Sequence, residues 1–199
     1  MKTKYLLYTG RIIPIVFFIT TFICGFMLGD YNHFSRMVSE LGAIGTRSQF
    51  VFSAGLILCS AFSLLFVSGL YRVCKAIGIS AIPVIIILSY SLSIAGAAIF
   101  PLPLRLHLIM GMPSILLILS PLMSLILWKG EIQPVDIKQM AILSFCAMAL
   151  GFSAFIPGLL SNYPGLKQRF FHIGWSVWFF YLCYSFVRLL ENEKVKNFN

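Results

Sequence analysis

The chain has 199 residues, of which 59% are hydrophobic and 11% are charged, and its formal net charge is +9. Because a soluble domain carries about 25% charged residues, this composition excludes an ordinary water-facing surface and predicts an integral membrane protein. No basic stripe or basic-aromatic motif accompanies the positive charge, so we expect no nucleic-acid partner. Membrane lipids with anionic headgroups are the expected partners of the basic residues.

Six apolar runs of about 20 residues follow one another along the chain, each long enough to cross a hydrocarbon core as an α-helix. They are predicted at about residues 11–28, 50–70, 81–100, 106–128, 139–160 and 170–190. No alternating strand pattern competes with this interpretation. No linker separates the runs, so residues 1–199 are predicted to form a single all-α domain, an integral membrane bundle of six transmembrane helices.

The basic residues are distributed unequally between the two ends of such a bundle. The tails and the second and fourth connections hold ten of the 15 Lys and Arg residues, and the first, third and fifth connections hold the other five. Cytoplasmic loops carry an excess of Lys and Arg. The pattern therefore predicts a multi-pass protein of the inner (cell) membrane with both termini in the cytoplasm. The first, third and fifth connections then face outward.

The first connection carries an amphipathic pattern. The residues spaced i, i+3, i+4 and i+7 are Phe34, Met37, Val38 and Leu41. This spacing predicts a short interfacial helix that covers the outer mouth of the bundle. Arg36 and Glu40 lie one turn apart in that helix. Glu40 either pairs with Arg36 as a solvated acid, or turns inward as a base, a ligand or a partner of Arg47, and the pattern leaves both alternatives open.

The third and fifth connections resemble each other, because each brings a proline, an arginine and a histidine to the start of the next span. These residues are Pro103, Arg105 and His107 before the fourth span, and Pro164, Arg169 and His172 before the sixth. A duplicated hairpin would explain the similarity. The simpler explanation is that prolines end helices and basic residues flank membranes.

The start of the last span has the pattern of an anion site. Arg169, His172 and Ser176 are spaced i, i+3 and i+7, so they share one helix face, and Trp175 borders it. A guanidinium and an imidazole near a helix N-terminus suit a phosphate or a carboxylate. The alternative is that the basic residues are interfacial anchors and Trp175 belongs to the aromatic belt.

Ionisable groups near hydrocarbon need a partner or water, so we expect Glu40, His107, Arg169 and His172 to meet in one outward-facing polar pocket. The leading hypothesis is that this pocket binds or transports an anionic headgroup or a small ligand. The candidate ligand-binding residues are Ser39, Arg47, Arg105, Gln168, Arg169, Trp175 and Ser176. A structural or assembly role without a ligand is a third interpretation.

The alternative from another class is a membrane-embedded hydrolase of lipids or lipid-linked substrates. Glu40 or His107 would then be the general base, His172 a second acid or a ligand, and Arg169 the group that stabilises the developing anion. The metal and cofactor content is left open. His33, His107 and His172 are candidate zinc ligands, with Asp30 or Glu40 completing the set, and histidines on the fourth and sixth spans would equally suit haem.

Three short motifs carry a resemblance to a known family. They are Ser39-Glu40-Leu41-Gly42, Phe100-Pro101 with His107, and Gly165-Leu166 with Arg169. In these the chain resembles the bacterial and archaeal "domain of unknown function 998" membrane proteins over nearly its whole length. The resemblance implies a six-helix membrane protein and no particular activity.

A fainter similarity is to the ceramidase and adiponectin-receptor superfamily of membrane hydrolases, which gather three histidines, an aspartate and a serine around zinc. The three histidines, Asp30 or Glu40, and Ser39 would take those parts here. Those proteins have seven spans and a His-x-x-x-His pair, whereas this sequence has six predicted spans and no such pair.

Overall fold

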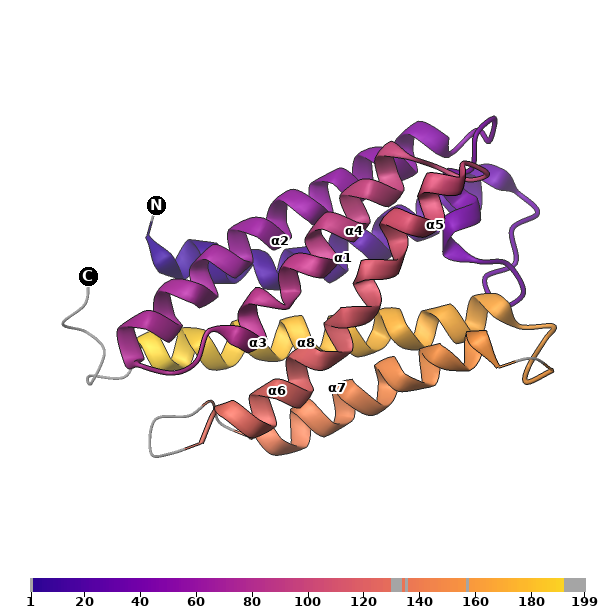
Figure 1. Ribbon diagram of the computed structural model, residues 1–199. Helices are drawn as coiled ribbons and strands as arrows, with labels where there is room; N and C mark the ends of the chain where they lie inside the picture. The colour runs from indigo at the N-terminus through magenta and orange to yellow at the C-terminus, as the bar shows by residue number, and fades with distance from the viewer. Residues whose placement is uncertain (1, 130–133, 135, 157, 192–199) are drawn as a thin grey trace.

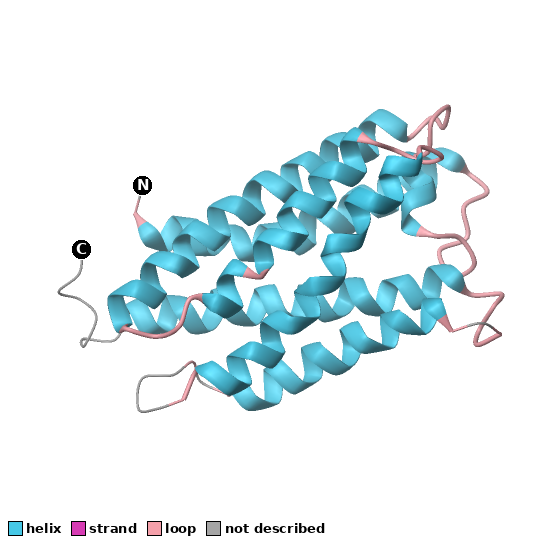
Figure 2. Ribbon diagram, in the orientation of Figure 1, coloured by secondary structure: helices cyan, strands magenta, loops and turns pink. Residues whose placement is uncertain are grey.

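The computed structural model describes residues 2–129, 134, 136–156 and 158–191. Within these residues the fold is all-helical and contains no strand (Figure 2). Lys194 and Lys196, which enter the count of basic residues, lie outside the described part of the chain.

The first two long helices form an antiparallel hairpin. Helix α1 is Thr3–Leu28 and α2 is Gln49–Ile77. The two backbones approach closely, since a Cβ at Gly69 would lie 3.1 Å from the backbone nitrogen of Leu7. Residues 71–75, which lie beyond the predicted end of the second apolar run at about residue 70, belong to α2. The helix continues until Gly78 ends it in the left-handed conformation.

The third and fourth predicted spans are helical but interrupted. The third consists of α3 (Ile82–Ile85) and α4 (Ile87–Ile99). The fourth consists of α5 (Arg105–Gly111), a 3₁₀ helix η2 (Met112–Ile118) and α6 (Leu119–Leu127). Pro113 lies at the start of the 3₁₀ segment, where its missing N–H removes an α-helical hydrogen bond.

The last part of the chain is α7 (Ile137–Gly151), a 3₁₀ turn η3 (Phe152–Phe155) and α8 (Pro164–Glu191). The stretches long and apolar enough to cross a membrane are Thr3–Leu28, Gln49–Ile77, Ile82–Ile99, Arg105–Leu127 and Pro164–Glu191. Helix α7 is apolar but has only 15 residues. Within the described residues, therefore, five helices of spanning length make this a multi-pass membrane protein, and the fifth predicted span is the shorter α7.

Helix α8 lies in the middle of the bundle, between α1 and α7 (Figure 1). Its aromatic residues Trp175, Trp178, Phe179 and Phe186 are fully buried. The start of α1 and the end of α8 lie at one end of the bundle, and the connections after α1, α4 and α7 lie at the other end. The predicted grouping of the first, third and fifth connections at one end is thus present.

The first connection, residues 29–48, contains a shorter helix than predicted. The 3₁₀ helix η1 covers only Val38–Gly42. The side chain of Asn32 accepts hydrogen bonds from the backbone N–H groups of residues 34 and 35, which holds residues 32–35 in a turn. Val38 and Leu41 are buried as predicted, whereas Phe34 and Met37 are exposed. The apolar spacing therefore identified the buried anchors but not a continuous amphipathic helix.

Candidate functional site: an arginine-capped cavity between α1 and α8

Arg169 projects from the second turn of α8 into the first connection. Its Nη1 donates hydrogen bonds to the carbonyl oxygens of Arg36, at 3.3 Å, and Gly165, at 3.1 Å. Its Nη2 donates to Tyr31 Oη, at 3.3 Å, and to His33 Nδ1, at 2.8 Å. Four of the five N–H donors of the guanidinium are thus engaged, three of them with the first connection.

Backbone and amide groups reinforce this attachment. The backbone N–H of Leu166 donates to Phe34 O, at 2.9 Å, and that of Val38 donates to Gln168 Oε1, at 2.7 Å. Gly165 permits the close approach, because a Cβ there would collide with the carbonyl oxygen of Arg36. We call these hydrogen bonds between residues 31–38 and residues 165–169 the α8 clamp. The clamp fixes the first connection over the start of α8.

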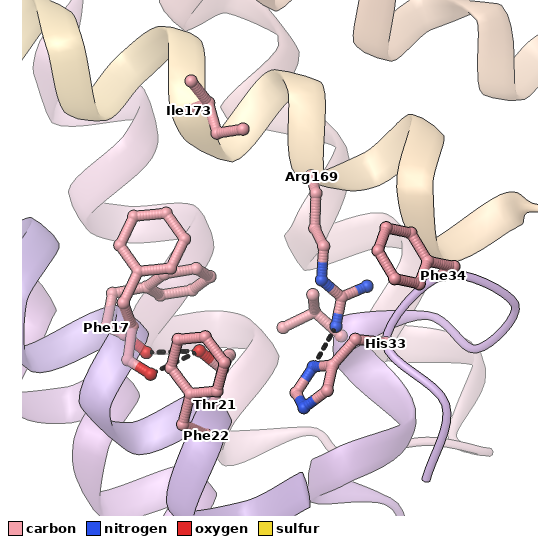
Figure 3. A pocket seen from close by; sticks show the side chains of 9 residues that line it. Phe17, Thr21, Phe22, His33, Phe34, Arg169 and Ile173 are labelled. Atoms are coloured by element: carbon pink, nitrogen blue, oxygen red, sulfur yellow. Dashed lines mark hydrogen bonds between the residues drawn. The ribbon is translucent and has the colours of Figure 1, made fainter.

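A cavity of about 300 Å³ lies beneath the clamp, between α1 and α8. It is lined by Phe17, Phe18, Thr21, Phe22, His33, Phe34, Val38, Arg169 and Ile173. Figure 3 shows Arg169 reaching from α8 toward His33, with side chains of α1 around the remaining space. Phe22 is 63% exposed and Ile173 is 47% exposed. Because lining residues are themselves exposed, the cavity opens on the outer surface of the bundle.

The charge of Arg169 is not neutralised by a described carboxylate. The acids nearest the clamp pair with another arginine: Glu40 lies 2.9 Å and Asp30 3.4 Å from nitrogens of Arg36. In the described part of the chain, no acidic group lies within ion-pair distance of Arg169, and nothing accepts a hydrogen bond from its Nε–H. The cavity therefore has apolar walls and a positively charged end.

The hydrogen bond with Arg169 determines the protonation of His33. A guanidinium can only donate, so His33 Nδ1 is the acceptor and the ring is neutral with its proton on Nε2. Burial, and then the neighbouring Arg169 charge, lower the pKa of His33 from its ordinary value of 6.5. Burial also raises the pKa of Tyr31, against the opposing effect of its hydrogen bond with Arg169. The uncharged imidazole is thus the form that suits the cavity without an anion.

Glu40 occupies the position expected of a paired acid. Its carboxylate accepts hydrogen bonds from Arg36 Nε, at 2.9 Å, and from the backbone N–H of Met37, at 2.8 Å. Arg169 contacts the backbone of Arg36 and not the Glu40 carboxylate, contrary to the expectation that the two would meet. Ser39 is half-buried in η1, and Arg47 is exposed. None of Ser39, Glu40 and Arg47 lines the cavity.

Trp175 and Ser176 each donate a hydrogen bond to His172, and none of the three residues lines the cavity. Trp175 Nε1 donates to His172 Nδ1, at 3.0 Å, and Ser176 Oγ donates to His172 O, at 2.6 Å. The imidazole packs against Phe17 with ring centroids 4.6 Å apart, and its buried Nε2 has no partner in the described residues. Trp175 is fully buried and therefore does not belong to an interfacial belt.

The third connection does not approach the cavity. His107 Nδ1 lies 2.9 Å from the carbonyl oxygen of Phe100, and Arg105 is exposed. Helix α5 has no buried residue and packs against α4 and η2. Of Glu40, His107, Arg169 and His172, which were expected to share one pocket, only Arg169 lines it.

The histidines are correspondingly separated. His33 bonds to Arg169, His107 to Phe100 and His172 to Trp175. Across the described ranges, no group of three or more His, Cys, Asp or Glu side chains is placed to hold a metal ion. The predicted zinc set of three histidines with Asp30 or Glu40 is therefore not assembled in this structure.

Two features were missed by the sequence reasoning. The apolar wall of the cavity comes from α1, where Phe17, Phe18, Thr21 and Phe22 repeat at i, i+4 spacing within an otherwise uniform apolar run. Lys167, a basic residue before the last predicted span, is only 4% exposed, and its Nζ donates to Leu159 O at 2.8 Å. A lysine beside the turn at residues 158–163 has a backbone acceptor that its position in the sequence did not reveal.

The long apolar helices, which pack side by side, define a polytopic α-helical membrane protein with a cavity at one end of the bundle. More particularly, the chain belongs to the family described as "Protein of unknown function (DUF998)", whose profile matches residues 12–185. No curated protein and no solved structure is detectably similar to the chain.

Proposed function

We propose that the cavity between α1 and α8 binds an amphipathic anion such as a lipid or fatty acid, and that the protein holds or transports it. The observation that carries this proposal is the half-buried guanidinium of Arg169, which faces an apolar cavity without a described carboxylate partner. A charged group near hydrocarbon is expensive unless it is paired. An anionic head bound at Arg169 supplies the missing charge.

The geometry suits both parts of such a molecule. The anionic head would accept the Nε–H of Arg169, the one donor that the clamp leaves unused. The apolar chain would lie on Phe17, Phe22 and Ile173 and leave the bundle where Phe22 and Ile173 are exposed. The cavity would therefore admit its ligand sideways from the membrane.

The binding proposal fits the structure better than the hydrolase alternative. A hydrolase would need Glu40 or His107 to face the substrate, but Glu40 is held by Arg36 and Met37, and His107 by Phe100. We also propose that α7 with η3 forms a sixth span, and that both termini lie in the cytoplasm of an inner-membrane protein. The excess of basic residues at the end that carries the termini supports this orientation.

The test is equilibrium binding of radiolabelled dodecanesulfonate to the purified protein in phosphatidylcholine nanodiscs. This probe carries a permanent negative charge and a single apolar chain. Dodecanol and dodecyltrimethylammonium, with the same chain but no negative charge, measure partition into the lipid. We expect saturable binding of the sulfonate alone, and Arg169→Gln should weaken it about tenfold or more, as the loss of a charge-assisted hydrogen bond implies.

Arg105→Gln is the matched control, because Arg105 lies at the same end of the bundle but is exposed and outside the cavity. It should leave the affinity unchanged. Ile173 makes none of the hydrogen bonds of the clamp, and Ile173→Trp should fill the cavity and abolish binding in a folded protein. Equal effects of Arg169→Gln and Arg105→Gln, or binding that Ile173→Trp does not alter, would overturn the proposal.

A further inference from the structure

His33 is the one ionisable side chain besides Arg169 among the described residues that line the cavity. Its Nδ1 accepts the 2.8 Å hydrogen bond from Arg169 Nη2. Its ring packs against Phe22, with centroids 5.3 Å apart, and against Tyr31, with centroids 4.9 Å apart. The imidazole thus occupies the charged end of the cavity and accepts a hydrogen bond from Arg169, the group proposed to bind the anion.

The surroundings of His33 contain positive charge and no described negative charge that contacts it. Helix α8 presents Arg169, and the first connection presents Tyr31. Helix α1 presents Phe22 and the backbone at Gly25, where a Cβ would lie 2.8 Å from His33 Nε2. The nearby acids Asp30 and Glu40 are paired with Arg36. If His33 were protonated with no anion in the cavity, its N–H and the N–H of Arg169 would point at each other, and the two positive charges would repel.

We infer that anion binding at this cavity is coupled to the uptake of one proton by His33, with the anion replacing His33 Nδ1 as the acceptor of the Arg169 Nη2 hydrogen bond. The inference rests on the proposed function. With an anion at Arg169, the protonated imidazole donates to the same anion, so both cationic side chains hold it. The half-buried negative charge then favours the imidazolium that the anion-free cavity disfavours.

The pH dependence follows by linkage. The anion-bound state takes up a proton more readily than the anion-free state, so affinity rises as the pH falls. As the pH falls, the affinity begins to rise at the pKa that His33 has in the complex. The rise is complete below the pKa that His33 has in the anion-free protein, which is lower than 6.5. Above that window the site holds neutral His33 and binds the anion through Arg169 alone.

The experiment is titration calorimetry with dodecanesulfonate in nanodiscs from pH 8 to pH 5, in buffers of different ionisation enthalpy. The sulfonate does not titrate in this range, so any proton taken up from the buffer is bound by the protein and not by the probe. We expect about one proton to be taken up near the middle of the window and an affinity about tenfold higher at the acid end. Thermal unfolding at each pH confirms that the protein is folded.

Two variants separate His33 from other groups. His33→Asn keeps an acceptor for Arg169 but cannot titrate, so it should bind the sulfonate with an affinity that does not change with pH. His107→Asn removes a histidine at the same end of the bundle but outside the cavity, and it should retain the wild-type pH dependence. Wild-type binding without proton uptake, or a pH dependence that survives His33→Asn, would refute the coupling and leave the proposed function intact. Absence of sulfonate binding at every pH would refute the proposed function itself.

Discussion

The starts of α5 and α8 look alike in sequence but have different surroundings in the structure. A proline lies shortly before α5 and is the first residue of α8, and each helix carries an arginine and a histidine near its start. At α8, Arg169 makes four hydrogen bonds and lines a cavity, whereas at α5, Arg105 is exposed. His107 bonds to a carbonyl oxygen of its own hairpin, while His172 is bonded to Trp175 inside the bundle.

The difference arises from a third segment. The first connection folds over the start of α8, where Gly165 leaves room for its carbonyl oxygens, and supplies acceptors for Arg169. The turn that precedes α5 meets that connection through one backbone hydrogen bond of 2.8 Å, from the N–H of residue 44 to the carbonyl oxygen of residue 102. A basic residue at a helix start therefore becomes part of a site when another segment covers it, and remains an exposed charge when none does.

The largest loss of stability is expected for Gly165→Ala, which adds a methyl group at this position. A Cβ there collides with the Arg36 carbonyl oxygen and would lie 2.8 Å from His33 O, so Gly165→Ala should lower the free energy of unfolding by about 3 kcal/mol through overpacking. At Gly111, the end of α5, an added Cβ would have nothing within 4 Å. Gly111→Ala should leave the stability unchanged or raise it slightly. Thermal unfolding of both variants in detergent measures the contrast, and equal destabilisation would contradict it.

The next effect concerns the two arginines. Arg169→Gln removes hydrogen bonds to the first connection and should destabilise the protein by about 2 kcal/mol. Arg105→Gln should change stability by less than about 0.5 kcal/mol, as expected of an exposed position. Hydrogen exchange should locate the loss of protection in residues 31–38. Loss of protection spread evenly over the bundle would show that Arg169 does not act through the clamp.

A smaller effect is expected at Gln168. Its Oε1 accepts the Val38 N–H at 2.7 Å, so Gln168→Leu should cost about 1 kcal/mol by leaving that donor without its acceptor. Gln139, exposed near the start of α7, provides the control Gln139→Leu. Faster exchange of the Val38 amide in Gln168→Leu alone is the expected result. Unchanged exchange would mean that this bond contributes nothing measurable to the clamp.

The smallest effect is that of pH on the clamp in the absence of an anion. Because the pKa of His33 is lowered in the folded protein, the released connection binds a proton more readily than the clamped one. The contribution of His33 to the clamp is fully present above its ordinary pKa of 6.5 and is lost as the pH falls toward the lower folded value. Exchange of residues 31–38, corrected for its intrinsic pH dependence, should rise at acid pH in the wild type and not in His33→Asn.

Much of the fold could be predicted because hydrophobic length is a strong local signal. The long apolar runs, their order and the gathering of three connections at one end follow from it. The length of α7 and the 3₁₀ segment at Met112–Ile118 do not follow from hydrophobic length, although Pro113 is a local signal for the second of them.

The candidate site was only partly predictable. Arg169 and Gln168 were identified from their position at a helix start, and both contact the first connection. His172 shares a sequence spacing with Arg169, but Trp175 and Phe17 take it into the interior. The apolar wall on α1 could not be recognised, because every face of a membrane helix is apolar and only packing distinguishes one from another.

The central claim is that the charged end of the α1–α8 cavity holds an anion whose chain lies between these helices. The most direct measurement is a crystal structure of the protein with a dodecanesulfonate brominated in mid-chain, using the anomalous signal of bromine. We expect the sulfonate at Arg169 Nε and the bromine beside Phe22 and Ile173. A bromine peak against α5, or no bromine peak in the cavity at a saturating concentration of the probe, would contradict the claim.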